Sequence, residues 1–502
     1  MRPVVCVIDH LHRDRDVAEA VAAGRFTHGG ETCELGREPD WLGARLPADE
    51  EWRIEWVKFY YGLDLAHAYR ETGARRFQDA WERLVGSWIR RVPPDHDSSD
   101  VTARRILNWI YAWQVFAPTA LHALLAESIA AQARHVRATL TPERNHRTLE
   151  LYALFVACLA LPGLDGDLDR FALAELDRNL AEDFRADGVH REASTHYHMV
   201  ALRSFLGVRA NARRFGLALP DGFEARLARA SAFARHCHRP DGRIPALSDA
   251  DTGSYPELLA LADELLGPAA DPNADFPDGG YHVQRSGWGA DDAFGVFDCG
   301  PLGDGGHGHY DLLSVELFAG GRPLVVDPGR GSYSEAPPNL RRWFRGTAAH
   351  NTVCVDGLDQ TPYTRTRPSG PVAEGRFLGR ARTEGRDTVA GEARSPAYDA
   401  VHRRRVTLVD GERWVIEDDL RGATGHRYDL RFHLAPDAQD ATRVAGDTVT
   451  APGVALRIRG ARRIALEPGW IAPRYGRRLP APVVSAVVEG VRARFVTEVA
   501  PA

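Results

Sequence analysis

The chain has 502 residues, too many for one ordinary hydrophobic core, so two domains are the natural expectation. Its composition, 44% hydrophobic and 26% charged, is that of a soluble globular protein, and no apolar run approaches the roughly 18 residues that span a bilayer. The net charge of −6 excludes a general attraction to nucleic acid, although a locally basic cleft could still bind a polyanion.

The start of the chain lacks the pattern of an export signal. Its first residues, MRPVVCVIDHLHRDRD, contain no apolar signal-peptide region. The six cysteines lie far apart, with neither a C-x-x-C pair nor a dense disulfide framework, and several lie in apolar runs as buried thiols do. We therefore expect a cytoplasmic protein, or a periplasmic or secreted one if the start is truncated, without a membrane or nucleic-acid partner.

The sequence predicts that the first half of the chain is mainly helical. Residues 1–50 are mixed in character and form a lead-in segment with Gly-Gly and Pro-Asp turns. From residue 51 to 275, helix-forming stretches follow one another with short Gly, Pro and Asp connectors. No repeat is visible residue by residue, but this succession fits an α-solenoid or an α/α toroid. In residues 75–91, five apolar side chains recur at helical spacing and are expected in the core: Phe77, Trp81, Leu84, Val85 and Trp88.

The sequence predicts that the second half of the chain is built from β-strands. Helical periodicity ends in the Pro- and Gly-rich segment 267–280, and we place a domain boundary near residue 275. In residues 276–502, stretches such as VTLVDGERWVIEDDL predict hairpins, here with Asp410-Gly411 at the turn. The expected fold class is therefore α+β and multidomain, with a helical domain followed by an antiparallel β-sandwich.

Two polar clusters lie at predicted helix starts. Asn145 and His146 open a long apolar helix, where Asn is a preferred cap and where the helix N-terminus favours anions. Glu150 follows His146 by one turn and could orient its imidazole. The stretch GVHREASTHYHMV contains Glu192 and Tyr197, which are either ordinary residues of a helix start or part of a site. A catalytic tyrosine needs cations or donors nearby, because its reference pKa is about 10.

A third cluster lies in residues 303–355. His307 and His309 are two residues apart, so both side chains point the same way in an extended segment. Asp327 and His350 could complete a tetrahedral zinc site with one histidine and a water, although scattered histidines in a β-domain are also common on polar surfaces. Asp249 and Asp251 could bind a cation, but capping of the next helix is the favoured interpretation.

The order of these motifs resembles a known family. G-H-x-H-x-D at 306–311, D-P-G at 327–329 and A-H-N-T-V at 349–353 follow Asn145-His146 and Tyr197-His198, an arrangement similar to the heparinase II/III-like polysaccharide lyases and closest to heparinase III-like members. The resemblance covers about residues 20 to 490. It implies that the helical domain, residues 51–275, is an incomplete (α/α) toroid, followed by the sandwich.

The resemblance also implies roles for individual residues. Asn145 and His146 would neutralise a uronate carboxylate, while Tyr197 and His307 would exchange protons with the sugar. One divalent ion, expected to be zinc and mainly structural, would bind at His309, Asp327 and His350. Contacts to the substrate would come from four further side chains: Glu150, Glu192, Trp109 and Arg345.

The chemistry indicates a substrate class. A glycosidase needs two carboxylates around the scissile bond, whereas His, Tyr and Asn suit proton abstraction beside a carboxylate and β-elimination of a 4-O-linked group. We expect a lyase that leaves a 4,5-unsaturated uronate, with heparan sulfate-like chains as the first substrate. The alternatives are alginate-like or exopolysaccharide uronates, a non-catalytic carbohydrate-binding protein, and a toroid glycoside hydrolase that uses Glu150 and Glu192. The oligomeric state is left open.

Overall fold

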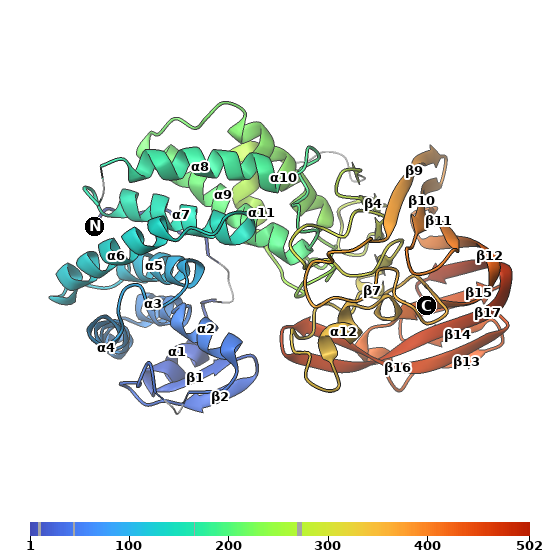
Figure 1. Cartoon of the computed structure of the whole chain (residues 1–502), viewed down its shortest axis with the longest axis horizontal. Helices are drawn as coiled ribbons and strands as arrows, with labels where there is room; N and C mark the ends of the chain where they lie inside the picture. Colours follow the sequence, from blue (N-terminus) through green and yellow to red (C-terminus); the bar gives the residue numbers. More distant parts are fainter. Residues whose placement is uncertain (9–11, 44–45, 165, 269–273) are drawn as a thin grey trace. The chain divides into compact units, whose positions relative to one another are not determined.

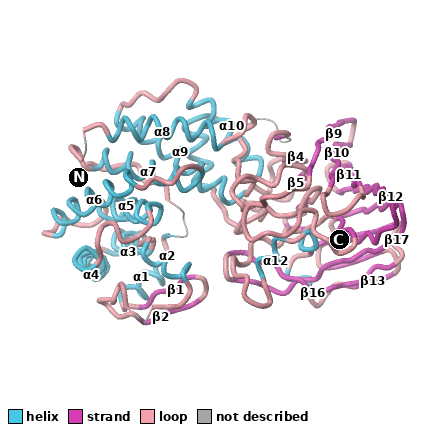
Figure 2. Tube along the Cα trace, in the orientation of Figure 1, coloured by secondary structure: helices cyan, strands magenta, loops and turns pink. Residues whose placement is uncertain are grey.

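The computed structural model describes residues 1–8, 12–43, 46–164, 166–268 and 274–502 (Figure 1). The chain forms two compact units. The first unit comprises Met1–Asp183 and Val200–Leu227, and the second comprises Phe184–Met199 and Ala228–Ala502. The predicted order, a helical region followed by antiparallel sheets, is confirmed (Figure 2).

The first unit is built mainly from helices. A short hairpin, β1 (Arg25–His28) and β2 (Glu31–Glu34), follows the first helix. The helices that lie wholly in this unit are α1 (Arg15–Ala22), α2 (Glu50–Val57), α3 (Tyr61–Thr72), α4 (Arg75–Arg91), α5 (Ser99–Trp113), α6 (Leu121–Ala138), α7 (Arg144–Ala160) and α8 (Leu168–Asp183). Two more are shared between the units: α9 (Thr195–Phe215) and α10 (Phe223–Cys237).

The apolar spacing of α4 decides which of its faces is buried. The five side chains expected in the core are at most 2% exposed, which confirms the helical interpretation: Phe77, Trp81, Leu84, Val85 and Trp88. Aromatic rings from separate segments pack against this helix, including Trp41, whose ring lies 5.1 Å from that of Trp88. Among the helices in the described parts of the chain, none is long and apolar enough to cross a bilayer.

The second unit contains α11 (Pro256–Leu266), a short helix α12 (Leu340–Arg345) and two antiparallel sheets. The smaller sheet has five strands in chain order: β3 (Ala274–Phe276), β4 (Tyr281–Arg285), β5 (Phe294–Asp298), β6 (Val315–Ala319) and β7 (Arg322–Val325). The change from helix to strand thus falls between Leu266 and Ala274. The predicted domain boundary near residue 275 stays a prediction, because the compact units share α9 and α10.

The larger sheet has ten strands in the order β13-β14-β15-β17-β12-β11-β10-β9, with β16 paired to β17 and β8 to β12. Their bounds are β8 (Val353–Val355), β9 (Glu374–Thr383), β10 (Arg386–Arg394), β11 (Val401–Val409), β12 (Arg413–His433), β13 (Arg443–Ala445), β14 (Thr448–Ala451), β15 (Val454–Arg459), β16 (Arg463–Arg474) and β17 (Arg477–Ala500). The hairpin predicted at Asp410-Gly411 joins β11 to β12. Both residues have positive φ, 54° and 71°, as such turns require.

One apolar core lies between the two sheets. Phe297 and Leu317 of the smaller sheet belong to the same buried cluster as Val406 and Trp414 of the larger one. The sheets approach closely where they meet: a Cβ added to Gly391 would lie 3.0 Å from the Phe297 ring. The loop between β5 and β6, residues 299–314, leaves this packed region and carries the His-x-His motif.

Candidate active site and metal centre

The loop that carries the two histidines is held in one shape by its own backbone. At its base, Asp298 donates its backbone N–H to the carbonyl of Ser314 at 3.0 Å, which extends the β5–β6 ladder by one pair. Between the histidines, Gly308 lies so close to Leu302 that a Cβ would be 1.6 Å from the Leu302 carbonyl oxygen. Only glycine therefore fits between the two imidazoles, which explains the Gly-flanked motif.

His307 lies among three of the chemically important side chains. Its Nδ1 is 2.9 Å from Asp249 Oδ2, and its Nε2 is 3.5 Å from Glu192 Oε2. Its ring stacks on that of Tyr197, with the ring centroids 3.9 Å apart and the planes at 20°. The imidazole remains 21% exposed, so a substrate can reach it. The second unit thus brings together Glu192, Tyr197 and His307, three residues that the sequence placed in the site.

Tyr197 is also part of a polar chain on its hydroxyl side. Its hydroxyl lies 3.2 Å from that of Tyr333. Arg330 donates to the Tyr333 hydroxyl at 3.4 Å and pairs through two nitrogens with the Asp251 carboxylate. Burial raises the pKa of the Tyr197 phenol above its ordinary value, against the opposing charge of Arg330. The phenol is therefore protonated at neutral pH and is a proton donor in its resting state.

Asp249 fixes the protonation of both histidines. Its carboxylate is fully buried and faces His307 Nδ1 and His309 Nε2, each at 2.9 Å, and it also accepts from Arg341. Burial alone would raise the pKa of Asp249, but Arg341 and the two imidazoles hold it well below the usual range. An ionised carboxylate only accepts, so both facing nitrogens carry protons. The remaining nitrogens, His307 Nε2 and His309 Nδ1, are left with lone pairs when the rings are neutral.

This geometry corrects the expectation that Asp249 and Asp251 cap a helix. Helix α11 has Tyr255 at its N-cap, and no side chain caps it. Asp251 instead pairs with Arg330, and Asp249 lies at the centre of the histidine cluster. Capping residues act on a neighbouring turn, whereas these two carboxylates bond to residues far along the chain, which spacing alone does not reveal.

The predicted metal ligands lie together in the second unit. His309, Asp327 and His350 each offer one ligand atom, and these atoms all lie within 4.8 Å of one another. All three side chains are at most 2% exposed. His350 Nδ1 is 2.7 Å from Asp327 Oδ2, while His309 Nδ1 and His350 Nε2 have no hydrogen-bond partner within the described residues. Buried ring nitrogens without partners are costly, so the set fits a bound cation.

The neighbours of this cluster also fit a metal centre. The other ring nitrogen of His309, Nε2, donates a hydrogen bond to Asp249, and such a bond fixes the tautomer of a metal-binding imidazole. Asp327 accepts the backbone N–H of Gly329 at 3.1 Å, and Glu316 accepts that of Asp327 at 3.3 Å. Two nitrogens and one oxygen suit zinc or another borderline divalent ion. A metal-binding group is therefore supported.

Asn145 and His146 lie in the first unit, at the start of α7. Asn145 is 2% exposed, whereas the side chain of His146 is 48% exposed and its Nδ1 is 3.8 Å from Asp100 Oδ2. The N-cap of α7 is Glu143, so Asn145 is not the cap that the bare sequence favoured. His146 is accessible, and its predicted role in neutralising the uronate carboxylate with Asn145 stays a prediction.

Two other predicted substrate contacts of the first unit are buried. Glu150 accepts from Ser99 Oγ at 2.6 Å and from both the backbone and the hydroxyl of Thr141, at 2.7 and 2.6 Å. The Glu150 carboxylate thus binds Thr141, in the segment before α7, and Ser99 of α5, and it does not orient His146. Trp109 is 0% exposed and meets Phe59 edge to face, with ring centroids 5.4 Å apart. The packed helices bury this indole, so it is a core residue and not a sugar platform.

Arg345, the predicted contact for an anionic sugar group, is also buried. Its guanidinium donates to the carbonyls of Gly308, Thr364 and Thr366, at 2.6 to 3.0 Å. With no exposure, the side chain is occupied in holding the histidine loop against residues 364–366. The neighbouring Arg341 is the arginine that reaches the histidine cluster, through Asp249. The burial of Arg345 does not support its predicted contact with an anionic sugar group.

Sequence reasoning missed Tyr333 and Arg330 and undervalued Asp249. Tyr333 follows the D-P-G motif by four residues, and no local pattern marks it as a partner of Tyr197, which is 136 residues away. Asp249 lies 58 residues before His307. The sequence signal that could have identified Asp249 was its place in a polar loop, LSDADTG. Capping of the next helix was the simpler explanation for the aspartates of that loop.

Comparisons with known proteins agree along nearly the whole chain. The family description "Heparinase II/III N-terminus" matches residues 10–264, and "Heparinase II/III-like, C-terminal" matches residues 268–500. A heparin-sulfate lyase of Pedobacter heparinus is 23% identical over 497 residues, which cover 89% of this chain and 73% of that protein. The heparin-sulfate lyase of Bacteroides stercoris is also 23% identical, over 92% of this chain and 76% of its own.

Solved structures share the fold. "Crystal Structure of Heparinase III" superposes with a TM-score of 0.80 at 19% identity, over 100% of this chain and 86% of that one. The heparan sulfate lyase HepC from Pedobacter heparinus gives a TM-score of 0.66 at 20% identity, over 100% and 85% of the two chains. At such identities the likeness concerns the fold, and it agrees with the predicted fold class. Because one family description alone spans half of the sequence and the second takes up where it ends, the chain belongs to the heparinase II/III family.

Proposed function

We propose that this chain is a polysaccharide lyase that cleaves 4-O-linked uronates by β-elimination, with heparan sulfate-like glycosaminoglycans as the first substrate. The observation that carries the proposal is the stacked pair of Tyr197 and His307, with His307 Nδ1 held by the Asp249 carboxylate. The named relatives, heparin-sulfate lyases, support the choice of a sulfated uronate polymer.

The paired residues divide the two proton transfers between them. When the ring of His307 is neutral, its one ring hydrogen is on Nδ1, which donates a hydrogen bond to Asp249. Nε2 therefore carries a lone pair. This nitrogen takes the C5 proton of the uronate, and the electron pair of the C5–H bond forms the C4–C5 double bond as the C4–O bond breaks. Tyr197, whose phenol is protonated at rest, gives its proton to the leaving oxygen. One product end is a 4,5-unsaturated uronate and the other is a free hydroxyl.

The C5 proton is weakly acidic, so the charge that builds up on the uronate carboxylate must be stabilised. Asn145 and His146 are the proposed donors, on the strength of the family resemblance. A divalent ion at His309, Asp327 and His350 would hold the loop that presents His307. The role of this ion would be structural, since one of its ligands, His309, shares the Asp249 carboxylate with the proposed base.

The glycoside hydrolase alternative needs two carboxylates able to act on one bond. Glu150, one of its proposed pair, already accepts three hydrogen bonds and is 0% exposed. Glu192 is 1% exposed and faces His307 Nε2. Neither carboxylate is placed to protonate a glycosidic oxygen, and this favours elimination.

The test is a panel of uronate polymers and oligomers, including heparan sulfate, heparin, alginate and a bacterial exopolysaccharide, incubated with the purified chain. A lyase produces absorbance in the conjugated-alkene band together with new chain ends, and we expect the strongest signal on heparan sulfate. New reducing ends without that absorbance would indicate a hydrolase. Binding without any product, for the wild type and the Tyr197→Phe variant alike, would indicate a carbohydrate-binding protein.

A further inference from the structure

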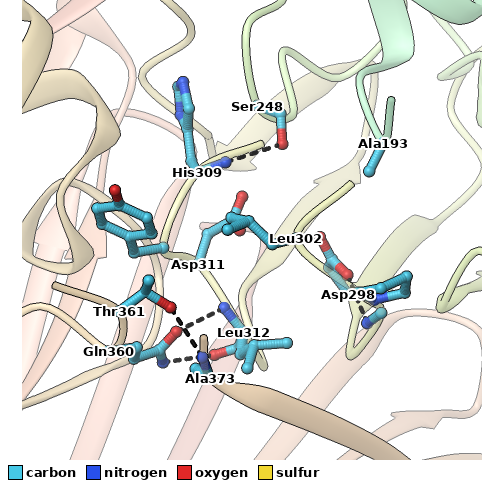
Figure 3. Close-up of a pocket in the computed structure, with 13 residues that line it drawn as sticks. Ala193, Ser248, Asp298, Leu302, His309, Asp311, Leu312, Gln360, Thr361 and Ala373 are labelled. Atoms are coloured by element: carbon cyan, nitrogen blue, oxygen red, sulfur yellow. Dashed lines mark hydrogen bonds between the residues drawn. The ribbon is translucent and has the colours of Figure 1, made fainter. Parts of the chain in front are cut away.

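A small cavity lies beside the metal centre in the second unit, and two carboxylates face it. Figure 3 shows the Asp311 carboxylate in the middle of the lining residues, between His309 and Leu302, with Asp298 on the far side of Leu302. Asp311 is the acidic residue of the G-H-x-H-x-D motif, and neither the proposed reaction nor the three-ligand metal group uses it. The remaining wall includes Gly300, whose only oxygen is a backbone carbonyl.

The backbone forces the two carboxylates into the same cavity. Asp298 ends β5, and Asp311 begins the turn that leads into β6. The Asp298 carbonyl accepts the N–H of Leu313 at 2.7 Å, and the Asp311 carbonyl accepts the N–H of Ser314 at 2.9 Å. Leu313 takes a positive φ of 65° to close this turn, a conformation that is strained for a leucine. The arrangement is thus imposed by the hairpin and does not depend on any attraction between the two side chains.

Among the described residues, neither carboxyl has a cation in direct contact, and the charge of His350 opposes the rise in pKa that burial causes for both. Asp298 is 8% and Asp311 6% exposed. Asp298 Oδ1 accepts one backbone hydrogen bond, from Gly300 at 2.9 Å, while Asp311 Oδ2 has no hydrogen-bond partner among the described residues. In the same residues, no arginine, lysine or histidine forms an ion pair with either carboxylate. A buried carboxylate without a partner is costly, and two in one cavity also repel each other.

We propose that Asp298 and Asp311 bind a hard cation of the calcium class in this cavity, separate from the ion of the His309–Asp327–His350 group. The oxygen donors at this place are carboxylates and backbone carbonyls, which are ligands that calcium takes at about 2.3–2.6 Å. A divalent ion would balance the two carboxylate charges. The neighbouring group offers two imidazole nitrogens and selects a softer ion. The two sites therefore differ in ligand type, although His309 contributes to the walls of both.

A cation here would join the two ends of the histidine loop. Asp298 lies before residue 299 and Asp311 near residue 314, so one ion would close the base of the loop that holds His307. With only two carboxylates, the dissociation constant for calcium should be about 10⁻⁴ M, at the weak end of protein sites. The site would be empty after ordinary purification in buffer without calcium and full at millimolar calcium.

Terbium luminescence tests the proposal, because Tyr310 lines the cavity and can transfer excitation energy to a bound lanthanide. The full chain is first saturated with zinc, then titrated with terbium, and calcium is added as competitor. We expect a tyrosine-sensitised signal that calcium displaces. The isosteric variants Asp298→Asn and Asp311→Asn should each weaken terbium and calcium binding by at least about tenfold, since one charged ligand is lost. Both should retain bound zinc. The matched control is Asp437→Asn, an exposed carboxylate paired with Arg322, which should bind like the wild type.

The reciprocal variant is His350→Gln, which should lose zinc and still bind terbium. Thermal melting provides a second measurement: millimolar calcium should raise the melting temperature of the wild type and of Asp437→Asn, but not that of Asp298→Asn or Asp311→Asn. The proposal is overturned if the zinc-loaded wild type shows no sensitised terbium signal that calcium displaces. It is equally overturned if both asparagine variants bind as the wild type does. A rise in melting temperature for Asp298→Asn without calcium, together with no calcium effect on the wild type, would mean that the two carboxyls share a proton instead.

Discussion

The imidazole of His307 lies flat on the phenol ring of Tyr197, with centroids 3.9 Å apart and planes at 20°. The stacking sets the two atoms proposed to transfer protons, His307 Nε2 and the Tyr197 hydroxyl, on neighbouring rings that cannot move independently. Each ring has its own anchor: Asp249 holds His307 at Nδ1, opposite Nε2, and Tyr333 contacts the Tyr197 hydroxyl itself. The proposed acid and the proposed base are therefore positioned before any substrate arrives, as elimination requires.

Tyr197→Phe removes one hydroxyl and leaves the stacked ring in place. We expect elimination on heparan sulfate to fall by about 10²- to 10⁴-fold, the usual contribution of a proton-transfer group. Product absorbance measures turnover, and thermal melting should show little change because packing is conserved. The control is Tyr363→Phe, which loses a hydroxyl that donates to Glu335 on the surface and should keep full activity. Wild-type turnover in Tyr197→Phe would remove this tyrosine from the reaction.

Tyr333→Phe tests the contact between the two tyrosine hydroxyls. The Tyr333 hydrogen bond lowers the pKa of Tyr197, so its loss should raise that pKa further. The alkaline limb of the kcat profile, where the Tyr197 acid loses its proton, should then move to higher pH. Losing one net hydrogen bond of about 1 kcal/mol should also reduce kcat by about fivefold, with KM unchanged. A profile identical to that of the wild type would mean that Tyr333 only packs against Tyr197.

Local chemistry in the sequence predicted the elements that depend on neighbouring residues. The Asp410-Gly411 turn and the buried stripe of α4 follow from turn preference and helical spacing, and both are found. The parallel direction of His307 and His309 follows from strand geometry, and both rings reach the same Asp249 carboxylate. Residue types alone left a metal site of Asp327, His350 and one histidine open, and the family resemblance favoured the group that includes His309, because no local pattern joins the three.

The errors share a physical cause, which is that burial depends on tertiary packing. Trp109, Glu150 and Arg345 have the chemistry of sugar contacts, but the packed helices and loops surround each of them with protein. The partners that complete the site, Asp249 for His307 and Tyr333 for Tyr197, come from distant parts of the chain. Residue type and spacing carry no information on which distant loops meet.

Asn145→Ala and His146→Ala test the proposed stabilisation of the uronate carboxylate. If these side chains act on charge that develops during proton removal, each change should lower kcat by about 10²- to 10³-fold. Steady-state kinetics on heparan sulfate oligomers separates this from simple substrate binding, which would raise KM and leave kcat unchanged. Arg170→Ala, on the surface of α8, is a control in the same unit. An effect on KM alone would assign both residues to binding.

Asp64 provides a pH prediction away from the site. Burial raises the pKa of this carboxyl to about 7 in the folded protein, while its unfolded value is about 3.9. A folded pKa above the unfolded one means that the stabilising contribution of Asp64 is complete below about pH 4 and is lost as the pH rises through 7. The loss is on the order of 4 kcal/mol, at 1.36 kcal/mol for each pKa unit.

Asp64→Asn should therefore flatten the pH dependence of the melting temperature between pH 4 and 7 and stabilise the first unit at pH 8. The amide can still accept the hydrogen bond that Asp14 donates to Asp64 at 2.8 Å. Asp79→Asn, an exposed residue of α4, is the control and should leave the dependence unchanged. A variant at Asp64 that is no more stable than the wild type at pH 8 would show that this carboxyl is ionised at little cost.

The two histidines of the loop should separate metal binding from proton transfer. His309→Ala removes a ligand from the group formed with Asp327 and His350, so metal content and melting temperature should fall together. Activity should fall as well, because the loop that carries His307 loses its anchor. His307→Ala should lower the rate of elimination by about 10²-fold or more. The variant should retain the metal and the melting temperature of the wild type. Elemental analysis, thermal melting and product absorbance on the same preparations check all three quantities. If His309→Ala lost activity but kept the melting temperature of the wild type, the ion would act in the reaction itself. If the wild type, purified without chelators, held no divalent metal, His309, Asp327 and His350 would be a structural cluster and not a metal site.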